Sequence, residues 1–195
     1  MHKIYEFIKF FEGECFMKKG FILTVAMLML CSFILTGCNS GSESSRAKVI
    51  DIPLTEEEYA FGVDKNQPEL LSKVNEFISQ IKSDGTLEKI SNKYFGDGEP
   101  EPVTSAVQDS SKDQLIIATN AAFEPFEYII GDKYYGIDME IAALLADHLG
   151  KELVINNMDF DAVCLSVGQG KADIAMSGLT IKEDRKEYVT FSDKY

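Results

Sequence analysis

In the first half of the chain, hydrophobic positions recur every three or four residues, which predicts two helices that each bury one face. The first helix is predicted to start with Asn66 as N-cap, Pro68 in the first turn and Glu69 closing a capping box. Gly85 and Gly96 predict where the two helices end. The apolar positions are Leu70, Leu71, Val74, Phe77, Ile78 and Ile81 in the first helix, and Leu87, Ile90 and Tyr94 in the second.

The second half alternates between short apolar runs and amphipathic segments, which predicts an α/β fold with a mostly parallel sheet flanked by helices. One helix is predicted to begin with Asp138 as its cap and to end at Gly150. A later helix is predicted to end near Gly168 or Gly170. Predicted strands cover 115–118, 153–155 and 173–176, with earlier strands at 49–54 and 59–63 and a hairpin at 127–135. The inward positions of the first of these helices are Ile141, Leu144, Leu145 and Leu149, and the spacing of Phe160, Val163, Cys164 and Val167 fits the later helix.

The N-terminal part of the chain has the pattern of a leader. Residues 1–16 show no assignable pattern and are interpreted as an extension upstream of a true start at Met17. Residues 17–37 combine a basic start with an apolar run, which predicts a lipoprotein signal peptide. The run ends in a sequence that resembles a bacterial lipobox, with Cys38 as the lipidated residue and residues 38–48 as a flexible tether. A transmembrane helix is the alternative, although the apolar run is at the short limit for a bilayer.

Composition excludes several classes of function. The formal net charge of −13 argues against nucleic-acid binding, which requires a basic surface. The four cysteines define neither a disulfide framework nor a CxxC metal site, and Cys164 is predicted to pack as a small buried residue. His148 is the only histidine after the signal peptide and is predicted to be exposed. The residues therefore suggest no metal, no cofactor and no nucleophilic triad.

A candidate anion site follows the strand at 173–176. Ser177 and Gly178 break that strand, Thr180 adds a hydroxyl, and the stretch from Lys182 to Arg185 is predicted to be the first turn of a short helix. Arg185 carries a fork of donors that suits a carboxylate. A βα turn with a surface arginine is the alternative. The stretch 120–123 also follows a strand, so both segments should lie at the same edge of the sheet.

Several motifs resemble the extracellular solute-binding proteins (family 3 type) of polar amino-acid ABC importers. The stretch Ser177–Arg185 followed by 189–193 is similar to the signature of that family. The stretches 118–127, 135–141 and 159–162 match it in the family's order. The resemblance covers residues 114–195 and implies one lobe of a type II periplasmic-binding-protein-like fold.

The resemblance also implies roles for individual residues. Thr180 and Arg185 would hold the α-carboxylate of the ligand, and Ser177 and Gly178 would offer oxygens to its ammonium group. Phe123 and Phe160 would flank its aliphatic part, with simple core packing as the alternative for both rings. Asn120 stands where cation-selective members often carry an acid, so the expected ligand is a free polar amino acid that is not strongly basic.

Residues 49–96 resemble the C-terminal end of the same family, although they come first here. This order suggests a circular permutation, in which residues 97–113, rich in Pro, Gly, Ser and acids, link the old ends. The early helices would then find their partner in the later sheet. The family continues past Tyr195 into a second lobe, so we interpret the chain as a fragment, with a true single lobe as the alternative. We expect weak or no ligand binding by one lobe alone.

The implied function is that of an amino-acid receptor without chemistry of its own, which passes its ligand to the permease and ATPase subunits of an ABC importer. It would be extracytoplasmic and attached to the bacterial membrane only through the lipid on Cys38. A ligand-sensing module of a signalling receptor is one alternative. A dehydratase-type enzyme on the same scaffold is the other, and it would need a pocket acid or base of tuned pKa.

Overall fold

The computed structural model describes residues 57–195. The predicted extension, signal peptide, lipidated Cys38, tether and strand at 49–54 therefore lie outside the described residues. Within residues 57–195, no helix combines the length and the hydropathy needed to cross a bilayer.

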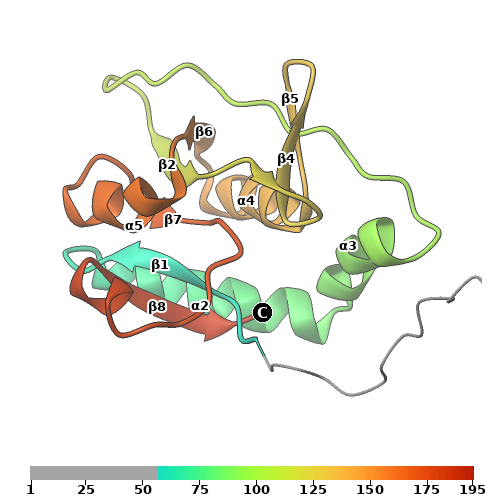
Figure 1. The fold of residues 1–195 in the computed structure, drawn as a ribbon, viewed down its shortest axis with the longest axis horizontal. Helices are drawn as coiled ribbons and strands as arrows, with labels where there is room; N and C mark the ends of the chain where they lie inside the picture. Colours follow the sequence, from blue (N-terminus) through green and yellow to red (C-terminus); the bar gives the residue numbers. More distant parts are fainter. Residues whose placement is uncertain (1–56) are drawn as a thin grey trace, which may run out of the picture. The chain divides into compact units, whose positions relative to one another are not determined.

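A five-stranded sheet forms the centre of this structure, in the order β6-β2-β7-β1-β8 (Figure 1). The strand β2 (Gln114–Thr119) pairs in parallel with β6 (Glu152–Asn157) and with β7 (Ile174–Ala175). The strand β1 (Ala60–Asp64) is antiparallel to both β7 and β8 (Val189–Lys194). Since β8 thus runs in the direction of β7, only β1 is reversed, which confirms the prediction of a mostly parallel sheet.

Helices cover both faces of the sheet. The helices α2 (Pro68–Ser83), α3 (Thr86–Phe95) and α4 (Ile137–Leu149) pack on one face, where Phe61, Leu115 and Ile117 point. The helix α5 (Phe160–Gly168) packs on the other face, where Ala118 and Ala175 point. This division follows from the alternation of side chains along a strand. The core therefore has two layers, one on each side of the sheet.

The early helices pack against later elements of the chain, because α2 contacts β8 and α3 contacts α4. The predicted stripe is the buried face of α2: Val74, Phe77, Ile78 and Ile81 are at most 4% exposed. The helix α3 is held to α4 by ionic and polar contacts, because Lys93 Nζ and Tyr94 Oη lie 2.6 and 2.7 Å from the carboxylate of Glu140. Residues separated by the linker thus share one hydrophobic core.

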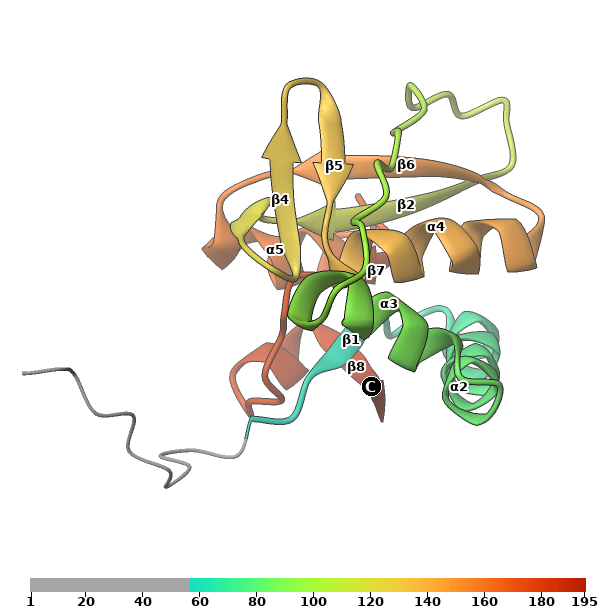
Figure 2. The ribbon, with the colours of Figure 1, turned by 90° about the vertical axis from the view of Figure 1, so that its right-hand side faces the viewer.

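The predicted linker is attached to the structure along its length. Val103 exchanges two backbone hydrogen bonds with Tyr134, of 2.8 and 3.0 Å. The Ala106 N–H donates to the Leu153 carbonyl at 2.8 Å. The hydroxyl of Ser105 accepts from the Ile155 N–H at the same distance. This stretch therefore runs beside β6 and a small second sheet of β3 (Ala122–Phe123), β4 (Glu127–Ile130) and β5 (Lys133–Tyr135). Figure 2 shows the β4–β5 hairpin projecting away from the main sheet.

Three local predictions were wrong at the starts of helices. Gln67, not Asn66, is the N-cap of α2 and makes no capping bond, because Asn66 turns back to bond the carboxylate of Asp64. The capping box with Glu69 is therefore not formed. Asp138 does not cap α4, which begins after Gly136, and its side chain points inward. Among the predicted core positions, Leu144 is 39% exposed.

Candidate functional site

The two predicted loops meet at the carboxyl ends of β2 and β7. These strands are adjacent and parallel, with Ala118 opposite Ala175, so the residues that follow them must emerge side by side. The backbone N–H of Asn120 donates to the hydroxyl of Ser177 at 3.0 Å. A Cβ added to Gly178 would lie 2.9 Å from the ring of Phe123. The predicted convergence of these four residues is confirmed in position.

Thr180, Phe160 and Arg185 form a second group at the same edge. Nη1 of Arg185 donates to the Thr180 carbonyl at 2.7 Å, and the guanidinium carbon lies 5.0 Å from the centre of the Phe160 ring. The cation–π contact with Phe160 and the hydrogen bond to Thr180 together fix the position of the Arg185 guanidinium. A cavity of about 270 Å³ opens beside it, lined by Phe160, Cys164, Leu179, Arg185 and Tyr188 among others.

The segment that carries Arg185 differs from the prediction. The stretch from Lys182 to Arg185 was expected to open a short helix, but a turn occupies its end and only a three-residue 3₁₀ helix follows, at Arg185–Glu187. So short a helix presents no row of free N–H groups, and the anion-binding capacity of this segment therefore lies in the guanidinium itself.

Both predicted aromatic residues are on the surface. Phe123 is 46% exposed and Phe160 is 42% exposed, so simple core packing does not describe either ring. Phe123 stacks on Phe126 with ring centres 5.4 Å apart, and Phe126 in turn contacts Tyr59 at 4.7 Å. The rings thus offer flat apolar surface at the edge where the two loops meet.

Two buried acids lie behind the loops, and the sequence analysis gave neither of them a place in the site. Glu127 and Asp138 are both 0% exposed. Glu127 accepts a hydrogen bond of 3.0 Å from the Ser177 hydroxyl, and Asp138 accepts one of 2.8 Å from the Gly178 N–H. The hydroxyl of Tyr195 also donates to Asp138. The sequence did offer a signal for Glu127, because it is an acid inside the apolar run 126–130. Acids are seldom buried without a partner, so a buried acid in a strand predicts a polar partner nearby.

Burial raises the pKa of both carboxyl groups. The pKa of Glu127 rises to about 9, chiefly through desolvation and then through the negative charge of Asp138. Desolvation likewise raises the pKa of Asp138 to about 6, although the bonds from Tyr195 and Gly178 favour its ionised form. Both carboxyl groups therefore keep their protons to a higher pH than acids in solvent do.

Ser177 and Gly178 present different groups to the edge. Ser177 is 1% exposed, and its hydroxyl is engaged by Asn120 and Glu127, so it holds the loops together from behind. Gly178 is partly exposed and has a φ of +48°. Its N–H is bonded to Asp138, and no donor among residues 57–195 bonds its carbonyl. The carbonyl of this partly exposed residue is thus an acceptor without a partner among residues 57–195.

The sequence was compared with known proteins. It matches the bacterial extracellular solute-binding proteins, family 3, over residues 7–97 and 115–195, which is most of its length. The chain belongs to this family. The break in the match coincides with the predicted linker.

Known relatives of this family 3 protein include amino-acid-binding proteins and one enzyme. The arginine-binding extracellular protein ArtP of Bacillus subtilis is 39% identical over 87 residues, which is 45% of this chain and 34% of ArtP. The cyclohexadienyl dehydratase of Pseudomonas aeruginosa is 30% identical over 95 residues, 45% of this chain and 35% of the enzyme. The chain therefore spans about a third of the length of the curated relatives it matches.

Solved structures with similar sequences include the arginine-bound form of domain 1 from TmArgBP. That structure is 38% identical, with a TM-score of 0.41 over 45% of this chain and 71% of the other. An ancestral arginine-binding protein bound to arginine is 36% identical, with a TM-score of 0.40 over 42% of this chain and 37% of the other.

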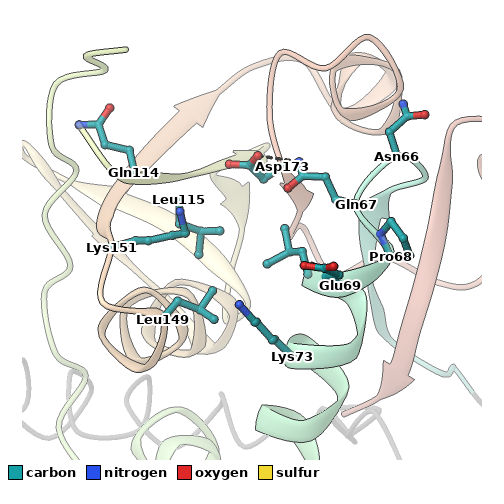
Figure 3. A pocket seen from close by; sticks show the side chains of 11 residues that line it. Asn66, Gln67, Pro68, Glu69, Lys73, Gln114, Leu115, Leu149, Lys151 and Asp173 are labelled. Atoms are coloured by element: carbon teal, nitrogen blue, oxygen red, sulfur yellow. Dashed lines mark hydrogen bonds between the residues drawn. The ribbon is translucent and has the colours of Figure 1, made fainter. Parts of the chain in front are cut away.

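A larger cavity of this solute-binding protein lies at the opposite edge of the sheet. It measures about 520 Å³ and is lined by residues at the start of β2, β7 and α2, including Gln114, Asp173 and Gln67 (Figure 3). Asp173 is fully engaged there, since it accepts bonds of 2.8 Å from Gln67 and from the Ile116 N–H. None of the predicted site residues lines this cavity, and we therefore place the candidate site at the carboxyl edge.

Proposed function

We propose that this protein captures a free amino acid by its α-carboxylate, as the receptor component of an ABC importer. The observation that carries this proposal is the guanidinium of Arg185, which is held on Phe160 and on the Thr180 carbonyl. The hydrogen bond to the Thr180 carbonyl uses only Nη1 of Arg185, so other N–H groups of the guanidinium remain for a carboxylate. The hydroxyl of Thr180 would supply a further donor to the same carboxylate.

The other end of the amino acid would meet the Gly178 carbonyl. An ammonium group needs acceptors, and this carbonyl is bonded by no donor of the described chain. Phe123 and Phe160 would flank the aliphatic part of the ligand, since both rings are open to solvent. Asn120 uses its amide N–H₂ on the Met158 carbonyl at 2.7 Å, which leaves an uncharged oxygen. We therefore propose a polar ligand that is not strongly basic.

The wider assignment rests on the family and on the sequence. Family 3 members are extracellular solute-binding proteins, and a relative from Chlamydia trachomatis, 31% identical, is named as a probable ABC transporter arginine-binding protein. We propose that the ligand passes to a membrane permease driven by an ATPase. Lipidation of Cys38 would keep the receptor at the membrane. The packing of α2 on β8 and of α3 on α4 supports a circularly permuted arrangement of the family fold.

A binding role is preferred over a catalytic one because of where the acids lie. The dehydratase relative makes an enzyme the natural competitor. General acid–base catalysis requires a titratable group within reach of the substrate. The two acids of raised pKa, Glu127 and Asp138, are 0% exposed and lie behind the loops. They can organise the site, but they do not face a ligand at the rim. A sensing module would share the binding geometry, and purification of membrane complexes would distinguish it by its signalling partner.

Arg185→Ala tests the proposal. NMR titrations of the full chain with L-glutamine and L-arginine, up to about 10 mM, detect dissociation constants in the millimolar range. We expect the variant to lose about 10- to 100-fold in affinity, because each charge-assisted bond contributes about 1.5–3 kcal/mol. Its circular dichroism and thermal unfolding should stay close to those of the wild type.

Lys186→Ala is the matched control. Lys186 is the next cation along the chain, is exposed, and pairs with the exposed Glu183 at 2.6 Å. Its removal should leave affinity unchanged. Equal binding by wild type and Arg185→Ala would contradict carboxylate capture at this residue. Tighter binding of arginine than of glutamine would overturn the proposed preference for a ligand that is not strongly basic.

A further inference from the structure

Gly178 is held in an unusual conformation by two contacts. Its φ of +48° lies in the left-handed region, which glycine enters freely and other residues rarely do. On one side, the ring of Phe123 occupies the place where a Cβ would be. On the other, the N–H is bonded to Oδ2 of Asp138 at 2.8 Å. The remaining polar group of this partly exposed residue is its carbonyl.

Asp138 reaches Gly178 from a different element and from inside the core. It lies in the first turn of α4, it is 0% exposed, and its other oxygen accepts from the Tyr195 hydroxyl. Burying a carboxylate is costly unless hydrogen bonds and favourable dipoles compensate it. The two bonds and the N-terminus of α4 provide that compensation. The acid is thus placed where it can fix the backbone of a loop forty residues away in the sequence.

We propose that Asp138 is a positioning residue for recognition of the ligand's ammonium group, through its hold on Gly178. This inference rests on the proposed function, in which the Gly178 carbonyl accepts from that ammonium. A glycine without the anchor can adopt several backbone conformations, and only some of them direct its carbonyl to the rim. The bond to Asp138 restricts Gly178 to one of them before the ligand arrives, which lowers the entropic cost of binding.

Asp138 could also act through its charge alone, and two variants separate these effects. Asp138→Asn keeps an oxygen acceptor for the Gly178 N–H and removes the charge. Asp138→Leu removes both the acceptor and the charge and keeps the number and branching of the side-chain heavy atoms. The charged and titratable groups that face Asp138 are Glu127 on β4, Tyr195 after β8 and Tyr59 before β1, and all three are unchanged in both variants.

The readout is the preference for an amino acid over the same molecule without its ammonium group. L-glutamine is compared with glutaramate, and L-arginine with 5-guanidinopentanoate, by NMR titration of the full chain. We expect the wild type to prefer the amino acid by about tenfold, the worth of one charge-assisted bond. In Asp138→Leu the preference should fall to within about threefold of unity, while the affinity for the deaminated analogue stays near the wild-type value. Asp138→Asn should retain most of the preference.

The outcomes are separable. If the wild type binds an amino acid but shows no preference for it over the deaminated analogue, ammonium recognition fails, and the proposed function fails with it. If the wild type shows the preference and Asp138→Leu keeps it, only the role of Asp138 is overturned. Equal loss in Asp138→Asn and Asp138→Leu assigns the effect to charge and overturns positioning. Asp147→Leu, an exposed acid on the same helix, is the control and should behave as the wild type.

A measurement on the wild type covers the case in which Asp138→Leu does not fold. The Gly178 amide should be protected from hydrogen exchange in the free protein, because it is bonded to a buried carboxylate. Addition of L-glutamine or L-arginine should shift the ¹³C resonance of the Gly178 carbonyl and leave its amide protected. An amide that exchanges freely, or that loses protection when the ligand is added, overturns the proposal.

Discussion

The replacement of Glu127 by glutamine is expected to stabilise the protein at neutral pH, although it alters a buried residue that bonds Ser177. Glu127 is 0% exposed, and its Oε2 has no hydrogen-bond partner among residues 57–195. Glutamine has nearly the same shape, and its oxygen can still accept from the Ser177 hydroxyl. The substitution therefore removes the ability to ionise and little else.

The magnitude follows from the pKa of Glu127, which is 4.5 as a reference and about 9 in the folded chain. Between these two values the folded chain keeps a proton that the unfolded chain releases. The contribution of Glu127 to stability is thus fully present below pH 4.5 and is lost as pH rises towards 9. From pH 4.5 to 7, at about 1.4 kcal/mol per pH unit, the wild type loses about 3 kcal/mol through this group.

Urea unfolding followed by circular dichroism at several pH values between 4 and 8 measures this effect, since the chain has no tryptophan for fluorescence. Glu127→Gln and the wild type should be about equally stable near pH 4. At pH 7 the variant should be more stable by about 3 kcal/mol. Asp138 is present in both proteins, so the difference between their stabilities reports the ionisation of Glu127 together with its coupling to Asp138.

Glu88→Gln provides the control, because this exposed acid of α3 stays in solvent when the chain folds. The free energy of unfolding of the Glu88→Gln variant should equal that of the wild type at each pH between 4 and 8. A Glu127→Gln variant that is less stable than the wild type by a constant amount from pH 4 to 8 would refute the reasoning. That result would mean that Glu127 is ionised in the folded chain and that its charge has a partner.

Two further substitutions test the packing of the site and of the fold. Gly178→Ala should destabilise the protein by about 1–3 kcal/mol, because φ is +48° and the new Cβ would lie 2.9 Å from the Phe123 ring; thermal unfolding measures this, and a neutral effect would contradict the described loop. Ile78→Ala should cost about 2–5 kcal/mol if α2 is docked on the sheet, whereas the exposed neighbour Ser79→Ala should cost little, and equal effects in urea unfolding would argue against docking.

Regular elements were predictable because their signals are local. The buried face of α2 follows from the spacing of its apolar residues, and Gly150 ends α4 with a φ of +69°, as a glycine after a helix commonly does. The convergence of the two loops was also predictable, because adjacent parallel strands end at one edge. The helix signals come from near neighbours in the sequence, whereas the convergence follows from the general geometry of parallel sheets.

Asp138, Glu127 and Asn66 show where local signals do not suffice. An aspartate at the start of a helix can cap it, can face solvent or can point into the core, and all three look alike in the sequence. Asp138 points inward because its partners, Gly178 and Tyr195, arrive later in the chain. Glu127 is buried against Ser177 in the same way. Asn66 fails as a cap because the carboxylate of Asp64 competes for it.

The place of β1 inside the sheet has a consequence for synthesis. Its partners β7 and β8 lie at the far end of the chain: the Phe61 N–H bonds the Ser192 hydroxyl across 131 residues. A ribosome therefore releases β1 long before either partner exists, and loop closure over such a separation is slow. Until then the strand exposes apolar side chains and unpaired backbone N–H and C=O groups, a combination that associates between chains. We expect the nascent protein to depend on chaperones more than its modest size would suggest.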